Sequence, residues 1–294
     1  MAGVVMVHGI WNRQRGMEPG EAAVALAKRH RSRLEQGLAA SGLTHVPVPD
    51  VAMAYYAHVL SDGWQDQAAG QAETRLEDLS PAQQEDAREW LELAGVPVPQ
   101  EMQAGVLAPL RQMVGWLVRR RTGDGVAATV HKDISERLSR LIIAFLQDTD
   151  AYTSRPRRRQ QAREVVAQTI REHRPTVVVA HSLGSVVAYE ALHEFSDLQA
   201  ELLVTLGSPL GLPAMMRKLD PEPISGYGQR PPGVGRWVNV ADVGDLVALP
   251  PKLGGCFPVD AHETTDIGLL AFHSLERYLA DGMTGAVIAP HLAH

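Results

Sequence analysis

The sequence predicts an α/β protein whose mostly parallel central sheet is flanked by helices. Short, continuous apolar runs recur along the chain, and the segments between them carry helix-favouring patterns. Such apolar runs are typical of parallel strands, which are buried on both faces. Their alternation with helices favours the crossover connections of a parallel sheet. With 294 residues, the chain is long enough for one large α/β domain or two smaller ones.

Charge and composition exclude several classes of protein. The net charge of −6 gives no general attraction to nucleic acid, so we expect no nucleic-acid partner. The single cysteine, Cys256, excludes an internal disulfide framework and a cysteine-rich zinc site, and it fits a reducing cytoplasm. The chain start lacks the charged and apolar regions of a secretory signal, and no apolar run approaches the roughly 18 residues of a membrane span. We therefore expect a soluble, cytoplasmic protein.

Three segments predict the first half of the core. Residues 4–7 form a short apolar run that ends at a histidine and a glycine, which indicates a buried strand and its exit loop. Glu21 to Ala40 is alanine-rich with spaced apolar residues, and Gly42 follows as a helix stop. Residues 46–56 indicate the next strand, whose prolines lie at its beginning, where a lost hydrogen-bond donor is tolerated.

Residues 60–154 differ from the rest of the chain, because they are charged, favour helices and contain no clear strand. A segment of this length between two core strands is too long for a plain loop. We interpret it as a helical insertion that forms a cap or lid, with residues 1–59 and 155–294 forming the core. The helices predicted in it are Pro81 to Ala94, Met102 to Arg121 and Asp133 to Gln147.

One part of this insertion raises the alternative of a membrane-surface contact. Four apolar residues lie beside Arg119 to Arg121, a combination that suits a lid meeting a lipid surface. They are Met113, Trp116, Leu117 and Val118. The more common reason for apolar residues at helical spacing is packing in a core, and arginine runs are usually solvated. Transient contact with a membrane surface therefore stays an alternative.

The return to the core leads to a serine. A helix is expected over Arg158 to His173, and the apolar run over residues 177–179 ends in Ala180-His181-Ser182-Leu183-Gly184. A serine hydroxyl is a weak nucleophile unless a base takes its proton and nearby donors stabilise the oxyanion. A sharp strand-to-helix turn exposes the serine and brings a backbone N–H beside it, but leaves room only for small flanking side chains. The alternative is a buried strand whose serine caps the next helix.

This pentapeptide resembles the nucleophile elbow of the α/β-hydrolase superfamily, specifically of its lipase-like esterases, with Ala180 in place of the first glycine. The resemblance implies an α/β-hydrolase fold, Ser182 as the nucleophile and the backbone N–H of Leu183 as an oxyanion donor. His181 lies at the same pocket, but we expect a structural role for it, because neighbouring side chains along a strand point to opposite faces.

The exit loop of the first strand carries a second resemblance. His8-Gly9-Ile10 is similar to the histidine-glycine motif that lipase-like hydrolases carry after an early strand. This resemblance implies that the backbone N–H of Ile10 is the second oxyanion donor, with His8, Gly9 and Trp11 at the pocket. The alternative is a glycine turn beside a core histidine.

A catalytic triad also needs a carboxylate that orients the histidine and stabilises its charged form. In the superfamily it comes from the loop after a later strand, which residues 237–241 predict here. That loop contains Asp245, which matches the family's acid position better, and Asp242, which we expect to brace the loop. The alternative is that both aspartates serve only turns. A rival nucleophile, Ser208, is followed by Pro209, which has no N–H to offer an oxyanion.

The base is expected after the acid, because the superfamily's chain order is serine, acid, histidine. His273 precedes an amphipathic helical start, and this placement resembles that of the family's histidine. His262 is the alternative base; it lies in an expected loop close behind the acid, and its sequence His-Glu-Thr-Thr-Asp is not a zinc motif. His291 and His294 lie in an expected frayed tail.

The resemblance implies a serine hydrolase that cleaves a carboxylic ester, of a small molecule or a lipid, through an acyl-enzyme intermediate. No metal or organic cofactor is required. Two alternatives stay open. The same triad can serve an acyltransferase, thioesterase or cyclase that receives an acyl chain from a carrier protein, with the arginine runs at 119–121 and 157–159 as its docking surface. The scaffold can also serve as a non-catalytic ligand-binding module.

Overall fold

The computed structural model describes residues 3–10, 12–60, 76, 79–97, 108–122, 127–268 and 273–292. The chain divides into two compact units. The core unit comprises Met1–Leu60 and Ala151–His294, and the insertion unit comprises Ser61–Asp150. The expectation that the insertion acts as a lid stays a prediction.

The core unit is built on a six-stranded sheet in the order β2-β1-β3-β4-β5-β6, in which every neighbouring pair is parallel. The strands are β1 (Val4–Val7), β2 (Val51–Ala54), β3 (Val177–His181), β4 (Ala200–Leu206), β5 (Val234–Asp242) and β6 (Ala261–Thr265). The predicted α/β class with a parallel sheet is therefore confirmed. In the centre of the sheet, β1 pairs with β2 on one side and with β3 on the other, and all its side chains are buried.

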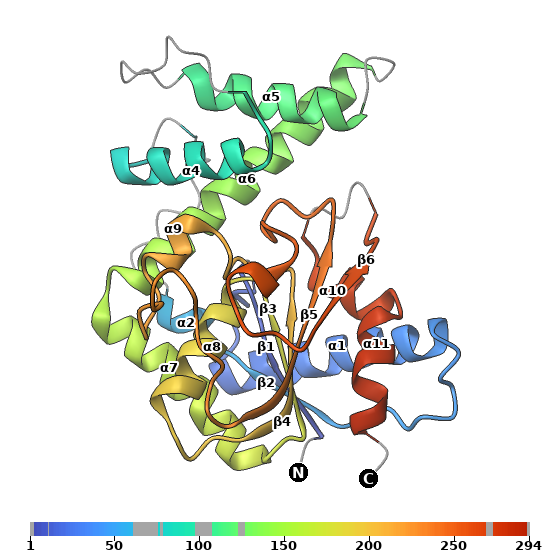
Figure 1. Cartoon of the computed structure of the whole chain (residues 1–294). Helices are drawn as coiled ribbons and strands as arrows, with labels where there is room; N and C mark the ends of the chain where they lie inside the picture. The colour runs from blue at the N-terminus through green and yellow to red at the C-terminus, as the bar shows by residue number, and fades with distance from the viewer. Residues whose placement is uncertain are drawn as a thin grey trace. The chain divides into compact units, whose positions relative to one another are not determined.

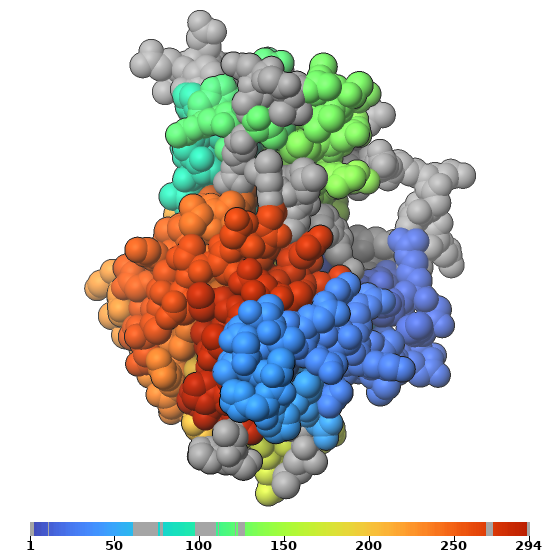
Figure 2. All heavy atoms as spheres, turned by 90° about the vertical axis from the view of Figure 1, so that its right-hand side faces the viewer, coloured from blue at the N-terminus to red at the C-terminus, as the bar shows by residue number. Residues whose placement is uncertain are grey.

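Helices cover both faces of this sheet (Figure 1). The core unit contains the helices α1 (Pro19–Ala40), α2 (Ala57–Leu60), α7 (Pro156–His173), α8 (Leu183–Glu194), α9 (Pro213–Met216), α10 (Leu275–Ala280) and α11 (Met283–Ile288), with short 3-10 turns η3 (Leu253–Gly255) and η4 (Ala289–His291). Helices α7 and α8 pack on one face, and α1, α10 and α11 pack on the other. Figure 2 shows α1 in blue beside the C-terminal helices in red.

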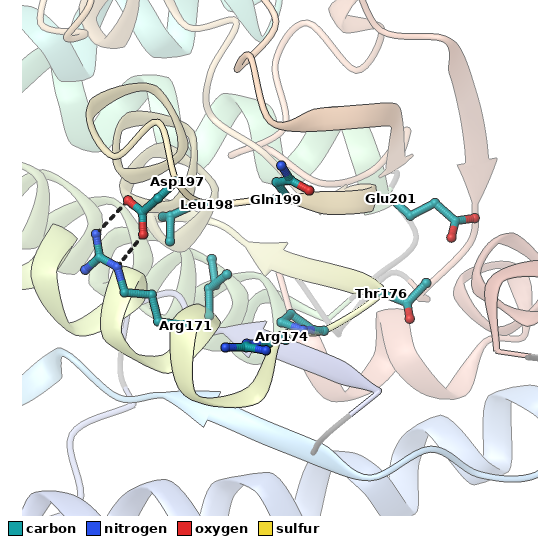
Figure 3. Close-up of a pocket in the computed structure, with 9 residues that line it drawn as sticks. Arg171, Arg174, Thr176, Asp197, Leu198, Gln199 and Glu201 are labelled. Carbon is teal, nitrogen blue, oxygen red and sulfur yellow. Dashed lines mark hydrogen bonds and ion pairs between the residues drawn. The ribbon is translucent and has the colours of Figure 1, made fainter.

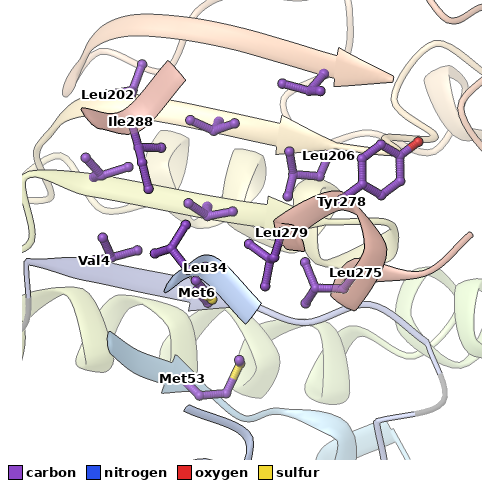
Figure 4. Close-up of a cluster of buried hydrophobic side chains, with 14 of the residues drawn as sticks. Val4, Met6, Leu34, Met53, Leu202, Leu206, Leu275, Tyr278, Leu279 and Ile288 are labelled. Atoms are coloured by element: carbon purple, nitrogen blue, oxygen red, sulfur yellow. The ribbon is translucent and has the colours of Figure 1, made fainter. Parts of the chain in front are cut away.

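Apolar side chains from both layers form the core between the sheet and the second group of helices (Figure 4). The strands contribute Val4, Met6, Met53, Val179 and Val204, and the helices contribute Leu26, Leu34, Leu275, Leu279 and Ile288. Apolar burial of this kind stabilises the fold by roughly 25 cal/mol per Å² removed from water. It also fixes α10 against the sheet, which matters for the site described below.

The insertion unit is helical where it is described. It contains α4 (Pro81–Leu93), α5 (Ala108–Thr122) and most of α6 (Ala128–Thr153). Ser80 and Gln83 form a capping box at the start of α4, so the first backbone donors of that helix have acceptors. Residues 101–107, where the second helix was expected to begin, lie outside the described residues, and α6 is longer than the predicted helix at both ends.

The apolar residues of α5 that suggested a lipid surface are mostly buried. Met113, Leu117 and Val118 are at most 2% exposed, whereas Trp116 is 37% exposed. Their helical spacing therefore reflects packing more than a free apolar face. None of the helices in the described ranges combines the length and the apolar character needed to cross a bilayer.

Two sequence readings at the C-terminal end of the core are wrong. The expected loop around His262 is instead β6, the edge strand of the sheet. Most of its residues are half-buried or exposed, so no apolar run marks the strand in the sequence. His291, expected in a frayed tail, lies in η4, and its Nδ1 contacts the carboxylate of Glu201. His294 lies outside the described residues.

Candidate active site

The candidate site lies at the carboxyl edge of the sheet, between β1 and β3. The chain crosses from β1 to β2 in one direction and from β3 to β4 in the other, and α1 and α8 pack on opposite faces. In open α/β sheets, ligands bind beyond the carboxyl ends of the strands where the strand order reverses in this way. Ser182 follows β3 and Gly9 lies in the loop after β1, so both are at this point.

Ser182 has a strained backbone conformation. It is the N-cap of α8, with φ 56° and ψ −135°, a region that residues with a side chain rarely occupy. Strain of this kind persists only where the surrounding structure holds it, and it is concentrated at functional sites. Leu183 is the first residue of α8, so its N–H has no acceptor within the helix. A backbone donor is thus available directly after the serine.

Two glycines allow the loop after β1 to approach Ser182 closely. A Cβ on Gly9 would be 2.4 Å from the Cβ of Ser182, and a Cβ on Gly184 would be 2.2 Å from the carbonyl oxygen of His8. Neither position can therefore carry a side chain without a backbone shift. This contact places Gly9 against the serine, and the oxyanion role of the Ile10 N–H stays a prediction. Trp11 lies outside the described residues.

His273 and Asp245 form a buried pair. The Nδ1 of His273 donates to the Oδ2 of Asp245 at 2.7 Å, and the two residues are 8% and 1% exposed. The other carboxylate oxygen, Oδ1, accepts from the N–H of Val247 at 2.9 Å. These bonds orient the carboxylate, and the bond from Nδ1 sets the tautomer of the neutral imidazole, in which Nε2 carries the free lone pair.

Asp242 has a different set of partners. Its carboxylate accepts from the backbone N–H of Ile267, at 2.5 Å, and from that of Gly244. Both are contacts that hold the loop after β5. The structure therefore brings Asp245 to His273 and leaves Asp242 as the brace of the loop.

Among the described residues, no carboxylate pairs with the alternative base, His262. It lies on β6, and its Nδ1 accepts from the side-chain amide of Asn239 at 3.0 Å. The amide oxygen of Asn239 in turn accepts from Thr205 at 2.8 Å. His262 thus belongs to a polar chain across β4, β5 and β6.

His8 has both ring nitrogens occupied. Its Nδ1 donates to the carbonyl of Gly9 at 2.8 Å, and its Nε2 accepts from the N–H of Tyr56 at 3.1 Å. Burial lowers the pKa of His8 to about 4, because the charged ring would lose water contacts. The ring also stacks on Tyr56. His8 therefore joins the ends of β1 and β2 as a neutral core histidine, while Gly9 lies against the serine.

His181 stacks on His273, with ring centroids 4.5 Å apart. It is 4% exposed, and neither of its ring nitrogens has a hydrogen-bond partner among the described residues. Burial, followed by the neighbouring His273, holds the pKa of His181 well below its usual range. His181 therefore packs against His273 as a neutral ring.

The Oγ of Ser182 and the Nε2 of His273 are the two predicted site atoms that are still to be described. Both are buried, and neither makes a hydrogen bond to any described residue, including each other. Such bonds are often long in a site without substrate and tighten when the substrate binds. The rival nucleophile, Ser208, is instead engaged, because its Oγ bonds to the Oγ of Ser185 at 2.7 Å.

Two residues at the site were not found from the sequence. Gly207 has φ 53°, and a Cβ there would be 2.7 Å from the Oδ2 of Asp245 and 3.0 Å from the Cε1 of His273. The hydroxyl of Tyr278 donates to the same Oδ2 at 2.8 Å. A tyrosine on the apolar face of a helix needs a partner for its hydroxyl, and this is the signal that could have identified Tyr278.

A surface hollow of about 640 Å³ lies at the opposite edge of the sheet. It is lined by residues at the start of β3 and β4, among them Thr176 and Glu201 (Figure 3). The charges of Arg171 and Asp197 in its wall are already paired at 2.7 Å. This hollow is not part of the candidate site, because Ser182 and its neighbours lie at the carboxyl ends of the strands.

Comparison of the chain with protein-family models, with curated proteins and with solved structures finds no match. In the described part of the chain, no group of three or more His, Cys, Asp or Glu side chains is arranged to hold a metal ion. A function must therefore be argued from the geometry at the carboxyl edge of the sheet and from the motifs that resemble those of a known superfamily.

Proposed function

We propose that the protein is a serine hydrolase of the α/β-hydrolase fold that cleaves a carboxylic ester. The observation that carries this proposal is the buried pair of His273 and Asp245 at the sheet edge where Ser182 has a strained conformation. A structural serine at a helix N-cap has no need for either feature. The parallel sheet, the strand-to-helix turn at Ser182 and the glycine contacts behind it support the fold assignment.

In the proposed reaction, the Nε2 of His273 takes the proton of Ser182 while the serine Oγ attacks the ester carbonyl. Asp245 stabilises the imidazolium that forms. The oxyanion receives hydrogen bonds from the backbone N–H groups of Ile10 and Leu183. The tetrahedral intermediate that carries this oxyanion then collapses, and the bond to the alcohol breaks. The alcohol leaves with the proton that His273 took from Ser182. Water then attacks the acyl-serine, gives its proton to His273 and releases the acid, and the proton returns to Ser182.

A fluorophosphonate probe tests this proposal, because it forms a covalent bond only with an activated serine. The wild-type protein should be labelled and should hydrolyse a short p-nitrophenyl ester. Ser182→Ala should lose labelling and lower turnover roughly a thousandfold or more. Ser208→Ala is the matched control and should retain labelling, because the Ser208 hydroxyl is bonded to Ser185.

Other results would contradict the proposal. A folded wild-type protein that neither reacts with the probe nor turns over an ester favours the ligand-binding module. Turnover of acyl thioesters alone favours the class of acyltransferases and thioesterases. Loss of labelling in Ser208→Ala with labelling retained in Ser182→Ala would move the nucleophile to the loop after β4.

A further inference from the structure

Tyr278 lies at the candidate site, where its hydroxyl contacts Asp242 and Asp245. It belongs to α10 and is fully buried. Figure 4 shows its ring near the arrowhead end of the strands, beside Leu206. Apolar contacts of its helix neighbours Leu275 and Leu279 with the sheet hold α10 in place, so the position of the ring is fixed by the core.

The hydroxyl of Tyr278 has two partners whose chemistry determines the direction of both bonds. It accepts from the backbone N–H of Asp242 at 2.9 Å, because an amide nitrogen can only donate. Its own proton is therefore left for the Oδ2 of Asp245 at 2.8 Å, since a carboxylate can only accept. Tyr278 thus links the residue that braces the loop to the carboxylate that orients His273.

Asp245 Oδ2 receives two donors, the Tyr278 hydroxyl and the Nδ1 of His273. With the bond from the N–H of Val247 to Oδ1, three donors fix the carboxylate. The bond from the tyrosine also draws negative charge away from the oxygen that faces the imidazole. Removing it should leave a carboxylate that is freer to rotate and more basic.

We propose that Tyr278 is a positioning residue for the reaction, which holds Asp245 Oδ2 in line with His273 and moderates its basicity. This inference rests on the proposed function. Tyr278 touches neither the ester nor the oxyanion, and it acts only through Asp245. Because the tyrosine hydroxyl and the Nδ1 of His273 share the Oδ2 of Asp245, we expect loss of the hydroxyl to change the Asp245–His273 bond and, with it, the pH profile of the reaction.

The groups that face this pair come from several elements. His181 on β3 stacks on His273, Asp242 at the end of β5 contacts Tyr278 through its amide, and the ring of His181 lies 5.9 Å from that of Tyr278. Burial, followed by Asp245, raises the pKa of Tyr278 well above its usual range, so its hydroxyl stays protonated. With His181 held neutral, the ring that stacks on His273 from β3 carries no charge.

The test replaces the hydroxyl and leaves the ring. Tyr278→Phe should lower kcat/KM about tenfold, because one hydrogen bond to a charged group is lost. The midpoint of the acidic limb of its pH profile should move upward by about half a unit, because a more basic Asp245 stabilises the imidazolium. Tyr189→Phe is the matched control, since Tyr189 is also fully buried but its hydroxyl only accepts from Gln229, at 3.3 Å.

A second variant, which keeps the hydroxyl, tests the proposal even if Tyr278→Phe fails to fold. A 3-fluorotyrosine at position 278 has a more acidic hydroxyl, so its acidic limb should move downward. An active wild type with no shift in either variant would overturn the positioning role and leave the proposed function intact. A wild type that fails to react with the fluorophosphonate would overturn both. Equal losses in the Tyr278 and Tyr189 variants, with unmoved pH profiles, would identify a purely structural tyrosine.

Discussion

At the scale of single residues, the absence of side chains shapes the site as much as the reactive groups do. Gly9 and Gly184 let the loop after β1 lie against Ser182, and Gly207 leaves room for the bond between Asp245 and His273. Each glycine acts through close contact, which a methyl group would prevent. The pentapeptide tolerates Ala180 because that methyl group is buried within β3 and takes part in none of these contacts.

Gly207→Ala tests whether the site needs a residue without a side chain beside Asp245 and His273. The new methyl group would displace the Oδ2 of Asp245 or the ring of His273, so kcat/KM should fall about a hundredfold, the usual cost of a small misplacement. Gly226→Ala is the matched control, because Gly226 also has a positive φ, 77°, but nothing lies within 4 Å of its added Cβ.

The control separates backbone strain from crowding. Gly226→Ala should lose about 1 kcal/mol of stability from the left-handed backbone and keep its activity. Equal activity losses in the two variants would show that Gly207 is needed for its left-handed backbone conformation and not for the space beside Asp245. The measurements are steady-state ester kinetics together with chemical denaturation.

At the scale of elements, a buried ionic network holds α8, the helix that directly follows Ser182. Glu190 on α8 is fully buried, and its carboxylate contacts Arg159 at 2.5 Å and Arg163 at 2.7 Å, both on α7. The hydroxyl of Tyr152 donates to the same carboxylate at 2.5 Å. The side-chain partners lie on α6 and α7, and the backbone N–H of Asp220 also donates to Glu190, at 3.1 Å. The network therefore fixes α8 against α7, which packs on the same face of the sheet.

Arg163→Ala should destabilise the core unit by about 3–5 kcal/mol, because it leaves the buried Glu190 with fewer compensating charges. Arg171→Ala on the same helix is the matched control. Arg171 also pairs with a carboxylate, Asp197, but at the surface, where water screens the pair and little stability should be lost. Chemical denaturation measures both. A similar small loss in the two variants would show that the network does not stabilise α8.

Elements with a clear apolar pattern could be predicted from the sequence, and those without one could not. The buried strands β1, β3 and β4 are short apolar runs, and α1 and α7 have spaced apolar residues. The edge strand β6 has no such run, because its residues are largely accessible to solvent. A local sequence pattern reveals a strand only when many of its side chains are buried and therefore apolar, and an edge strand buries too few side chains for this.

The same limit applies to the site. Ser182, Asp245 and His273 could be named because their order and local motifs resemble those of a superfamily. No role at the site was predicted for Gly207 or Tyr278, because their contacts with Asp245 span 38 and 33 residues of chain, and only the folded sheet brings these residues together. Their roles depend on tertiary contacts, which a local pattern does not contain.

At the scale of the whole molecule, several histidines are buried in the neutral form. Burial lowers the pKa of His8 and of His30 to about 4, and that of His181 well below its usual range. In the unfolded chain these rings take up a proton near pH 6.5. Between pH 6.5 and about 4 these rings bind more protons in the unfolded chain than in the folded protein, so their contribution to the free energy of unfolding falls as the pH is lowered.

His30 allows this effect to be measured away from the candidate site. It lies on α1, is 2% exposed, and its Nδ1 has no hydrogen-bond partner among the described residues. A shift from 6.5 to about 4 corresponds to about 3 kcal/mol of stability that is present above pH 6.5 and lost by pH 4. His30→Leu should remove this contribution and flatten the pH dependence of the free energy of unfolding. His45→Leu, at an exposed position, should leave the slope as in the wild type. If denaturation between pH 4 and 7 gave the same slope for His30→Leu and the wild type, burial of neutral histidines would not be the cause of acid sensitivity.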